Sequence, residues 1–436
     1  MKFCTLTLGC KVNQFETQAI ENILISNGHT LVKVGAGCDV CIINTCTVTA
    51  ISAGKSRKAI RQLKKLEPEA LIAVSGCLSQ LEPDEIELIG VDILSGSGDR
   101  LKFVELIEQC YNANNRLSQD KATLISGEAL ISSEVGELIK QPVFEELPVG
   151  SQNKKSSRTR ALLKIQDGCN NYCAYCVIPY ARGHSRSLLP SIIGEQAKQL
   201  SQQGFREIVI TGIEISSYGK DIPDTPSLID VLKIVSEAAP DVRIRLGSLD
   251  PSIITDKLCT ELLGIINLCD HFHLSVQSGC DETLLRMGRK YTTDGVLHAI
   301  TKLRKQFPNC GITADLMVGF PGETDVEFEE TQQFIKQAAF SDMHVFPFSP
   351  RPGTRAAKMP NQISNSIKKN RAKIISTLAA EMSNNFKMSQ VGKTLEVLFE
   401  RKRDGYWVGY TTNYIEVAIK SDAENLRNCI KPIEIT

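Results

Sequence analysis

The sequence lacks the features that would place a protein in a membrane or outside the cell. It has no run of about 18 apolar residues that could span a bilayer, and its first residues alternate polar and apolar side chains instead of forming a secretion signal. It has no internal repeat, and its 50 basic residues balance 50 acidic ones. We therefore expect a cytoplasmic protein that does not bind membranes, and any nucleic-acid surface must be local.

Cysteine, by contrast, is abundant, with 15 residues in a chain of 436. A disulfide framework is not expected in so long a chain without a secretion signal. The cysteines are therefore predicted to be reduced and partly metal-bound. The hydrophobic share of 42% is enough for two to four domains, each with its own core.

The most informative motif is a C-x3-C-x2-C run made by Cys169, Cys173 and Cys176, with Tyr175 just before the last cysteine. Three thiolates on one short loop can hold three irons of a 4Fe–4S cube and leave the fourth iron open to another molecule. A zinc knuckle is the alternative, but zinc sites usually need a fourth ligand, and His184 lies eight residues further on. The spacing is similar to that of the radical S-adenosylmethionine (SAM) enzymes, in which SAM binds the open iron.

Residues 1–115 predict a doubly wound α/β domain. Strands are expected over Phe3–Leu8, Val40–Asn44 and Leu71–Ser75, and helical patterns separate them. Repeated strand–helix units indicate a parallel sheet. The helix expected over Ser52–Leu66 carries six basic residues.

Each of these strands is followed by a cysteine, namely Cys10, Cys46 and Cys77. The carboxyl ends of parallel strands lie at one edge of a sheet, where such folds bind ligands. We interpret the three residues as ligands of a second iron–sulfur cluster. Inert buried cysteines are the alternative, and three further cysteines fit that alternative well because they lie within or beside strands: Cys4, Cys38 and Cys41.

Residues 159–370 again alternate strand and helix and predict a partial (β/α)6 barrel. Its strands are expected over Leu162–Ile165, Ile208–Thr211, Arg243–Leu246, His271–Ser275, Ile312–Val318 and Asp342–Phe346. Chemistry in such barrels sits on the loops after the strands, so residues there are candidate SAM contacts. They are Tyr175, Gly212, Glu214, Ser248, Gln277, Arg289, Asp315 and Gly319.

The end of the chain changes character. A connector is expected over 116–158, and a linking helix followed by a small antiparallel β-barrel over 371–436. From Arg351 to Thr436 there are 15 basic and 8 acidic residues. Aromatic side chains at Tyr406, Trp407 and Tyr410 lie near a basic run, and this mixture suits phosphates and unpaired bases. An ordinary solvated face with a small core remains the alternative.

Taken together, two three-cysteine sites, a SAM-type barrel and a basic β-barrel resemble the radical-SAM methylthiotransferase family over essentially the full chain. The motif from Leu8 to Gln14, Leu-Gly-Cys-Lys-Val-Asn-Gln, looks like the branch that acts on N6-threonylcarbamoyladenosine in tRNA. The segments Arg245–Leu249 and Phe346–Thr354 are also similar to that branch. The tail resembles a TRAM domain, an RNA-binding module.

The resemblance implies a two-part reaction with two SAM molecules and two 4Fe–4S clusters. One SAM methylates a sulfur at the cluster of Cys10, Cys46 and Cys77. The other is cleaved at the second cluster to a 5′-deoxyadenosyl radical, and CH3–S is inserted at carbon 2 of the modified adenosine at position 37. Implied partners are the tRNA anticodon loop and an electron donor of the flavodoxin or ferredoxin type, with the sulfur donor unspecified.

Three other interpretations stay open at this point. The substrate could be isopentenyladenosine in tRNA or an aspartate of a ribosomal protein, both sister specificities of the family. A radical-SAM enzyme could carry out another reaction, such as plain methylation. A non-catalytic RNA-binding protein with structural metal would contain zinc without iron and would not cleave SAM.

Overall fold

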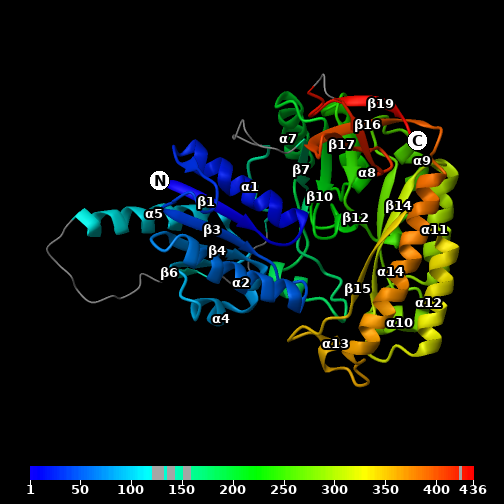
Figure 1. Cartoon of the computed structure of the whole chain (residues 1–436), viewed down its shortest axis with the longest axis horizontal. Coiled ribbons are helices and arrows are strands. Elements are labelled where there is room, and N and C mark those ends of the chain that lie inside the picture. The colour runs from blue at the N-terminus through cyan, green and yellow to red at the C-terminus, as the bar shows by residue number, and fades with distance from the viewer. Residues whose placement is uncertain (120–131, 135–142, 151–158, 422–424) are drawn as a thin grey trace. The chain divides into compact units, whose positions relative to one another are not determined.

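The computed structural model describes residues 1–119, 132–134, 143–150, 159–421 and 425–436, and the chain forms two compact units (Figure 1). The first contains Met1–Ser156, Asp167–Asn171 and Cys176–Leu188, and the second contains Ser157–Gln166, Tyr172–Tyr175 and Leu189–Thr436. Most of the predicted connector at 116–158 lies outside the described residues. Among the helices in the described ranges, none combines the length and the apolar character that crossing a bilayer requires.

The first unit is built on a parallel sheet with the strand order β2-β1-β3-β4-β5-β6. The strands are β1 (Lys2–Thr7), β2 (Thr30–Leu31), β3 (Val40–Thr45), β4 (Leu71–Gly76), β5 (Ile93–Ser95) and β6 (Ser132–Glu134). The helices are α1 (Lys11–Ser26), α2 (Ala50–Leu66), α3 (Cys77–Leu81), α4 (Pro83–Glu87) and α5 (Arg100–Gln119). The predicted strands over 3–8, 40–44 and 71–75 are thus confirmed within two residues at each end.

Two hydrophobic clusters cover opposite faces of this sheet. Because side chains alternate along a strand, Phe3 faces the cluster that contains Ile20 of α1 and Phe103 of α5. Its neighbour Cys4 faces the other cluster, with Ile60 of α2. Helices on both faces of a parallel sheet make the unit doubly wound, as the sequence predicts.

The second unit carries two parallel sheets, ordered β11-β10-β7 and β12-β13-β14-β15. The strands are β7 (Arg160–Lys164), β10 (Glu207–Thr211), β11 (Arg243–Leu246), β12 (Ser248–Leu249), β13 (His271–Gln277), β14 (Gly311–Val318) and β15 (Asp342–Pro347). The helices are α7 (Pro190–Gln202), α8 (Leu228–Ala238), α9 (Asp256–Leu263), α10 (Asp281–Met287), α11 (Thr293–Gln306) and α12 (Asp325–Ala338). All six predicted barrel strands are present, and β12 is an additional short one.

The cysteine loop lies between β8 (Gln166–Asp167) and the short helix α6 (Ile178–Arg182), which β9 (Arg186–Ser187) follows. Later in the chain come α13 (Arg355–Lys358) and the long helix α14 (Asn365–Met388). Between Leu189 and Pro347, strands and helices alternate as in a parallel barrel.

The C-terminal strands form an antiparallel sheet with the order β18-β17-β16-β19, a half-barrel. They are β16 (Thr394–Arg403), β17 (Tyr406–Thr411), β18 (Glu416–Lys420) and β19 (Ile430–Glu434). Trp407 packs with Phe399 in its core. The sheet contacts the starts of the barrel strands, where Arg243, the first residue of β11, donates to the carbonyl oxygen of Tyr410 at 3.4 Å. It therefore docks at the end of the barrel opposite to the loops that follow the strands.

Candidate functional site: three cysteines at the sheet edge

The first unit brings Cys10, Cys46 and Cys77 to one edge of its sheet, beyond the carboxyl ends of β1, β3 and β4. Cys10 is exposed and immediately precedes α1, while Cys77 is buried at the start of α3. A Cβ on Gly9 would lie 2.8 Å from the sulfur of Cys46, so only glycine lets the Cys10 turn approach that residue.

The pKa values of these thiols show that they share one environment. Burial raises the pKa of Cys77 to about 12, Arg182 opposes this shift, and the charges of Cys10 and Cys46 add to it. Burial likewise raises the pKa of Cys46, with Cys10 and Arg182 again acting in opposite directions. Metal ligation needs thiolates, so a bound cation would supply the charge that holds these sulfurs deprotonated.

Arg182 is a buried cation placed beside this cysteine group. Its guanidinium donates to both carboxylate oxygens of Glu16, at 2.8 and 3.1 Å, and to Asp167 at 3.1 Å. Arg100, also fully buried, donates to Glu16 at 2.9 Å. The sequence did not single out any of these four residues, since each charge finds its partner only after folding.

Asn13 connects the network to the sheet edge. Its amide nitrogen donates to the carbonyl oxygens of Leu8 and Thr45, at 2.8 and 2.9 Å, and its amide oxygen accepts from Arg182 at 2.7 Å. One side chain of the Leu8–Gln14 motif thus fixes the ends of β1 and β3 relative to each other. This explains why an amide suits that position.

The edge also contains a closely packed glycine and two polar atoms without a partner. Gly76, with φ of +108°, would bring a Cβ to 2.5 Å from the side-chain oxygen of Asn44. That Asn44 oxygen and the hydroxyl of Ser75 are buried without a hydrogen-bond partner in the described structure. Three convergent cysteines with a buried cation behind them fit an anionic iron–sulfur cluster, which is held by thiolates.

Candidate functional site: the cysteine loop and its surroundings

In the first unit, backbone N–H groups point at two sulfurs of the cysteine loop. Asn171 donates to the sulfur of Cys169 at 3.4 Å, and Ile178 donates to that of Cys176 at 3.5 Å. Such donors favour the thiolate and tune a cluster held by it. Gly168 has φ of +70°, and a Cβ there would lie 1.9 Å from the carbonyl oxygen of His184. The loop therefore begins with a turn that only glycine allows.

In the second unit, Arg289 lies against Cys173. Its guanidinium donates to the sulfur at 3.3 Å, to Asp250 at 2.8 Å and to the hydroxyl of Tyr291 at 2.9 Å. The backbone N–H of Ala174 donates to the carbonyl oxygen of Met287 at 2.8 Å, and the ring of Tyr175 meets that of Phe320 edge to face at 6.5 Å. These contacts position the middle of the loop.

Glu214 belongs to the same neighbourhood as Arg289. Burial and then the charge of Asp250 raise its pKa, and Arg289 acts against this shift. Its backbone N–H donates to the side chain of Gln166 at 2.7 Å. Gly212 lies at the end of β10, where a Cβ would be 2.9 Å from the carbonyl oxygen of Gln166. Cys173, Arg289 and Glu214 are thus grouped in one polar region.

The remaining predicted SAM contacts have other surroundings. Asp315 pairs with His273 at 3.2 Å, and a Cβ on Gly319 would meet the side chain of Lys368 at 2.4 Å. Ser248 is exposed at the start of β12. Gln277 ends β13 with φ of +66°, a left-handed backbone that glycine normally adopts. Outliers of this kind concentrate at functional sites.

Sequence comparisons divide the chain in the same way as its motifs. The Radical SAM superfamily matches residues 163–335, and an uncharacterized protein family, UPF0004, matches residues 2–96. The chain is 38% identical over 435 residues to the threonylcarbamoyladenosine tRNA methylthiotransferase MtaB of Bacillus subtilis, covering 98% of this chain and 92% of that protein. It is 32% identical to a tRNA-2-methylthio-N(6)-dimethylallyladenosine synthase of a Thermoanaerobacter species, covering 99% and 89%.

Solved structures share the fold at low sequence identity. The radical S-adenosylmethionine methyltransferase TsrM from Kitasatospora setae, with cobalamin and a [4Fe-4S] cluster bound, matches with a TM-score of 0.57 at 14% identity. The match covers 81% of this chain and 77% of that one. At this identity, the likeness concerns the architecture alone.

Proposed function

The chain belongs to the radical-SAM methylthiotransferase family, and from this premise we propose that it attaches a methylthio group to carbon 2 of N6-threonylcarbamoyladenosine at position 37 of tRNA. The observation that carries the substrate choice is full-length similarity to proteins named for that nucleoside. Identity is 38% to the B. subtilis protein and 35% to the Thermotoga maritima one, against 32% to a dimethylallyladenosine enzyme.

The family binds a 4Fe–4S cluster and SAM, and we assign these to Cys169, Cys173 and Cys176. We assign a second 4Fe–4S cluster to Cys10, Cys46 and Cys77. When bound, the clusters and SAM supply a methyl group and a carbon radical strong enough to activate an aromatic C–H bond, which side-chain acids and bases cannot do.

The chain's own residues hold and orient these groups. Arg182 offsets negative charge beside the group of Cys10, Cys46 and Cys77. Arg289, held in place by Asp250, does the same beside Cys173. Glu214 is the half-buried carboxyl group that we assign to the amino group of SAM. An unpaired base of the anticodon loop can be splayed out of its stack to reach such a site.

The remaining partners follow from this chemistry. Reductive cleavage needs one electron at low potential, so we propose a flavodoxin or ferredoxin type of donor. Because the proposed substrate is a tRNA, we propose that the enzyme acts in the cytoplasm. We assign binding of the tRNA backbone to the C-terminal segment from Arg351 to Thr436, which has 15 basic and 8 acidic residues and ends in the half-barrel, as in a TRAM domain.

The test is a reconstitution under anaerobic conditions with iron and sulfide. The enzyme then receives SAM, dithionite and one of three substrates: tRNA with threonylcarbamoyladenosine, tRNA with isopentenyladenosine, or the ribosomal protein. Mass spectrometry of the products should find a methylthio group on the first substrate only. Methylthiolation of either alternative with no reaction on the first would refute the proposed specificity.

Iron content tests the two cluster assignments separately. Cys10→Ala and Cys173→Ala should each lose about half of the iron, as expected for two three-cysteine clusters. Cys110→Ala, which changes a half-buried cysteine of α5, should retain all of it. If wild-type protein binds iron for only one cluster, the assignment of a cluster to Cys10, Cys46 and Cys77 is refuted. Deoxyadenosine release without sulfur in the product would indicate plain radical-SAM methylation.

A further inference from the structure

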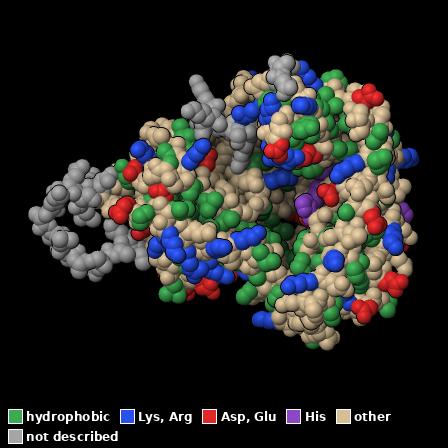
Figure 2. Space-filling view, viewed as in Figure 1, with side chains coloured by type: hydrophobic (Ala, Val, Ile, Leu, Met, Phe, Trp, Pro, Cys, Tyr) green, Lys and Arg blue, Asp and Glu red, His purple; other side chains and the backbone are tan. Residues whose placement is uncertain are grey.

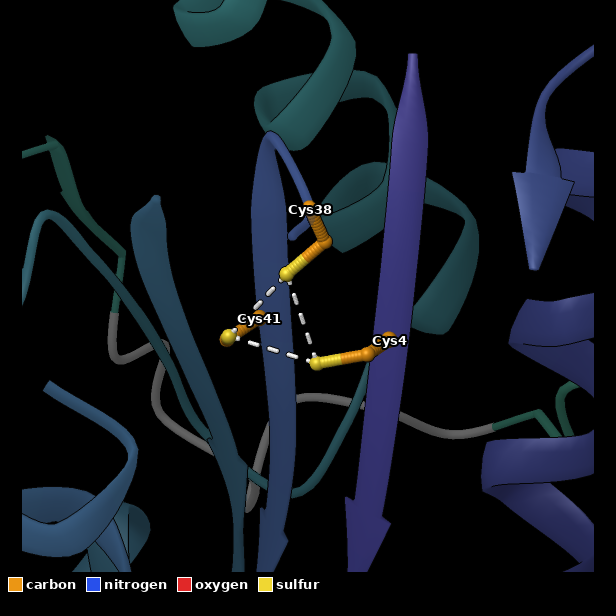
Figure 3. A group of neighbouring side chains, drawn as sticks. All are labelled: Cys4, Cys38 and Cys41. Atoms are coloured by element: carbon orange, nitrogen blue, oxygen red, sulfur yellow. Dashed lines mark hydrogen bonds between the residues drawn. The ribbon is translucent and has the colours of Figure 1, made fainter. Parts of the chain in front are cut away.

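A third group of cysteines lies inside the sheet of the first unit, away from its functional edge. The sulfur atoms of Cys4 and Cys41 are 3.2 Å apart, and that of Cys38 lies 3.6 Å from Cys4 and 3.4 Å from Cys41 (Figure 3). Among the residues that the structure describes, these are the only three Cys, His, Asp or Glu ligand atoms that all lie within 4.8 Å of one another. From their strand positions alone, the three residues are expected to be inert buried cysteines.

The sheet register brings two of these cysteines together. Cys4 of β1 and Cys41 of β3 are directly paired on neighbouring parallel strands, and both are fully buried on the face covered by α2. Cys38 precedes β3 and is half-buried, so it completes the group from its outer side. This arrangement gives a group of three sulfurs, two of them fully buried and the third near the surface.

The loop that carries Cys38 is held in place by Glu67. The carboxylate of this buried residue accepts hydrogen bonds from the backbone N–H groups of Gly35, Gly37 and Cys38, at 2.8, 3.2 and 3.4 Å. Gly35 and Gly37 both have positive φ, which this tight loop requires. On the other side of Cys38, Asp39 accepts from the backbone N–H of Lys2 at 2.6 Å. Hydrogen bonds on both sides of Cys38 thus hold this residue in place without a bound ligand.

The spacing suits one metal ion and not a cluster. In a 4Fe–4S cube each thiolate binds a different iron, so the ligand sulfurs are farther apart than contact distance. A single ion with bonds of about 2.3 Å, the zinc–thiolate length, needs sulfurs about 3.8 Å apart in a tetrahedron. The observed separations are 3.2 to 3.6 Å, so a shift of a few tenths of an ångström would admit the ion.

We propose that Cys4, Cys38 and Cys41 bind one soft closed-shell cation, Cu⁺ or Zn²⁺, at a site distinct from both iron–sulfur positions. Three thiolates are soft ligands that select these ions over hard cations such as Mg²⁺. Cu⁺ would be held by the three sulfurs alone, and Zn²⁺ would take a water on the side of Cys38 as its fourth ligand. The proposal does not depend on the methylthiolation reaction.

The test uses the full chain with its iron already assembled, under anaerobic conditions and with thiols reduced. Cu⁺ is supplied in slight excess from a competing chelator, unbound metal is removed, and copper and iron are counted. A second series uses Zn²⁺. Wild type should retain one more equivalent of at least one of the two ions than Cys38→Ala does, with equal iron in both proteins.

Two further variants keep this result interpretable. Cys110→Ala should retain as much metal as wild type, because that cysteine belongs to none of the three groups. Cys41→Ser should lose the metal as Cys38→Ala does. X-ray absorption should find three sulfurs around the ion, with an added oxygen only for Zn²⁺. Equal retention of both ions by wild type and Cys38→Ala, or fewer than three sulfurs around the ion, would overturn the proposal.

Discussion

Arg182 donates hydrogen bonds to both carboxylate oxygens of Glu16, at 2.8 and 3.1 Å, and neither side chain is more than 1% exposed. The same guanidinium reaches Asp167, just before the cysteine loop, and Asn13, three residues after Cys10. One buried cation therefore links segments near two cysteine groups within the first unit. Its charge is part of the environment of Cys46 and Cys77.

Replacing this cation should destabilise the first unit strongly. Arg182→Met leaves Glu16 and Asp167 buried with less compensating charge, and loss of one partner of a buried pair costs about 3 to 5 kcal/mol. Urea unfolding should show this loss, and iron bound after reconstitution should fall. Arg57→Met is the matched control, because Arg57 pairs with Glu82 and Glu85 at the surface and should cost less than about 1 kcal/mol. Equal effects of the two substitutions would contradict this account.

The buried ion pairs of Glu207 with Arg243 and Arg245, called here the Glu207 junction, should make the second unit less stable in acid. Burial raises its pKa, but Arg245 and then Arg243 outweigh burial and lower the pKa to about 2. A lowered pKa stabilises the fold above the ordinary value of 4.5, and this contribution is lost as the pH falls toward 2. The full loss is roughly 3 kcal/mol.

The junction is tested with Glu207→Gln, which should be the less stable protein at pH 6. Its stability difference from wild type should shrink between pH 4.5 and 2.5, measured by urea unfolding at each pH, because wild type alone loses the Glu207 contribution. Glu329→Gln is a suitable control, since that side chain is exposed on α12. A difference between wild type and Glu207→Gln that stays constant with pH would refute the low pKa.

Gly76 predicts a steric effect on the cysteine edge. Gly76→Ala forces a side chain to 2.5 Å from the backbone oxygen of Thr45 and into a φ of +108°. Gly28→Ala has a similar φ, +86°, but open space around the new Cβ. Gly28→Ala should cost about 1 to 2 kcal/mol of stability. Gly76→Ala should cost clearly more and also lower iron content toward half, as measured by unfolding and iron assay. Full iron in Gly76→Ala would contradict this view of the edge.

How far the sequence could predict the site depends on the range of the interactions. Strands and helices follow from short patterns, so β1, β3, β4 and the six barrel strands were found within a few residues of their ends. The strand-end positions of Cys10, Cys46 and Cys77 needed only the rule that parallel strands end at one edge. Elements with weaker patterns, such as β5 and α10, were not predicted.

Two features could not be predicted from the sequence. They are the register in which strands pair and the partners that buried charged side chains find. Cys4 and Cys41 are in contact because β1 and β3 pair in this register. A shift of one residue would place the two side chains on opposite faces of the sheet. Likewise, Arg182 and Glu16 lie 166 residues apart, and nothing local marks them as partners. Arg289 is predicted from the sequence as a SAM contact, a role that stays a prediction, while its contacts with Asp250 and Cys173 emerge only from the fold.

Helix α2 predicts a second contribution to tRNA binding. Lys55, Lys58 and Arg61 are exposed on this helix, and Figure 2 shows basic side chains gathered over it. Replacing all three with Gln should weaken tRNA binding at least tenfold at moderate salt. It should also reduce the salt slope of log K by about 2 to 3, because each of the three phosphates that is no longer neutralised removes about 0.7 to 0.9 from the slope.

The measurement is a filter-binding titration of tRNA at several salt concentrations, with thermal unfolding and iron content as checks on the fold. The matched control replaces Lys233 and Lys302 with Gln, since both are paired with acidic neighbours, Glu261 and Asp256. Replacing Lys233 and Lys302 should change tRNA affinity and its salt slope little, because their acidic partners already offset their charge. An unchanged salt slope in the α2 variant would show that this helix does not contact the RNA backbone, and would leave the basic C-terminal segment from Arg351 to Thr436 as the candidate surface.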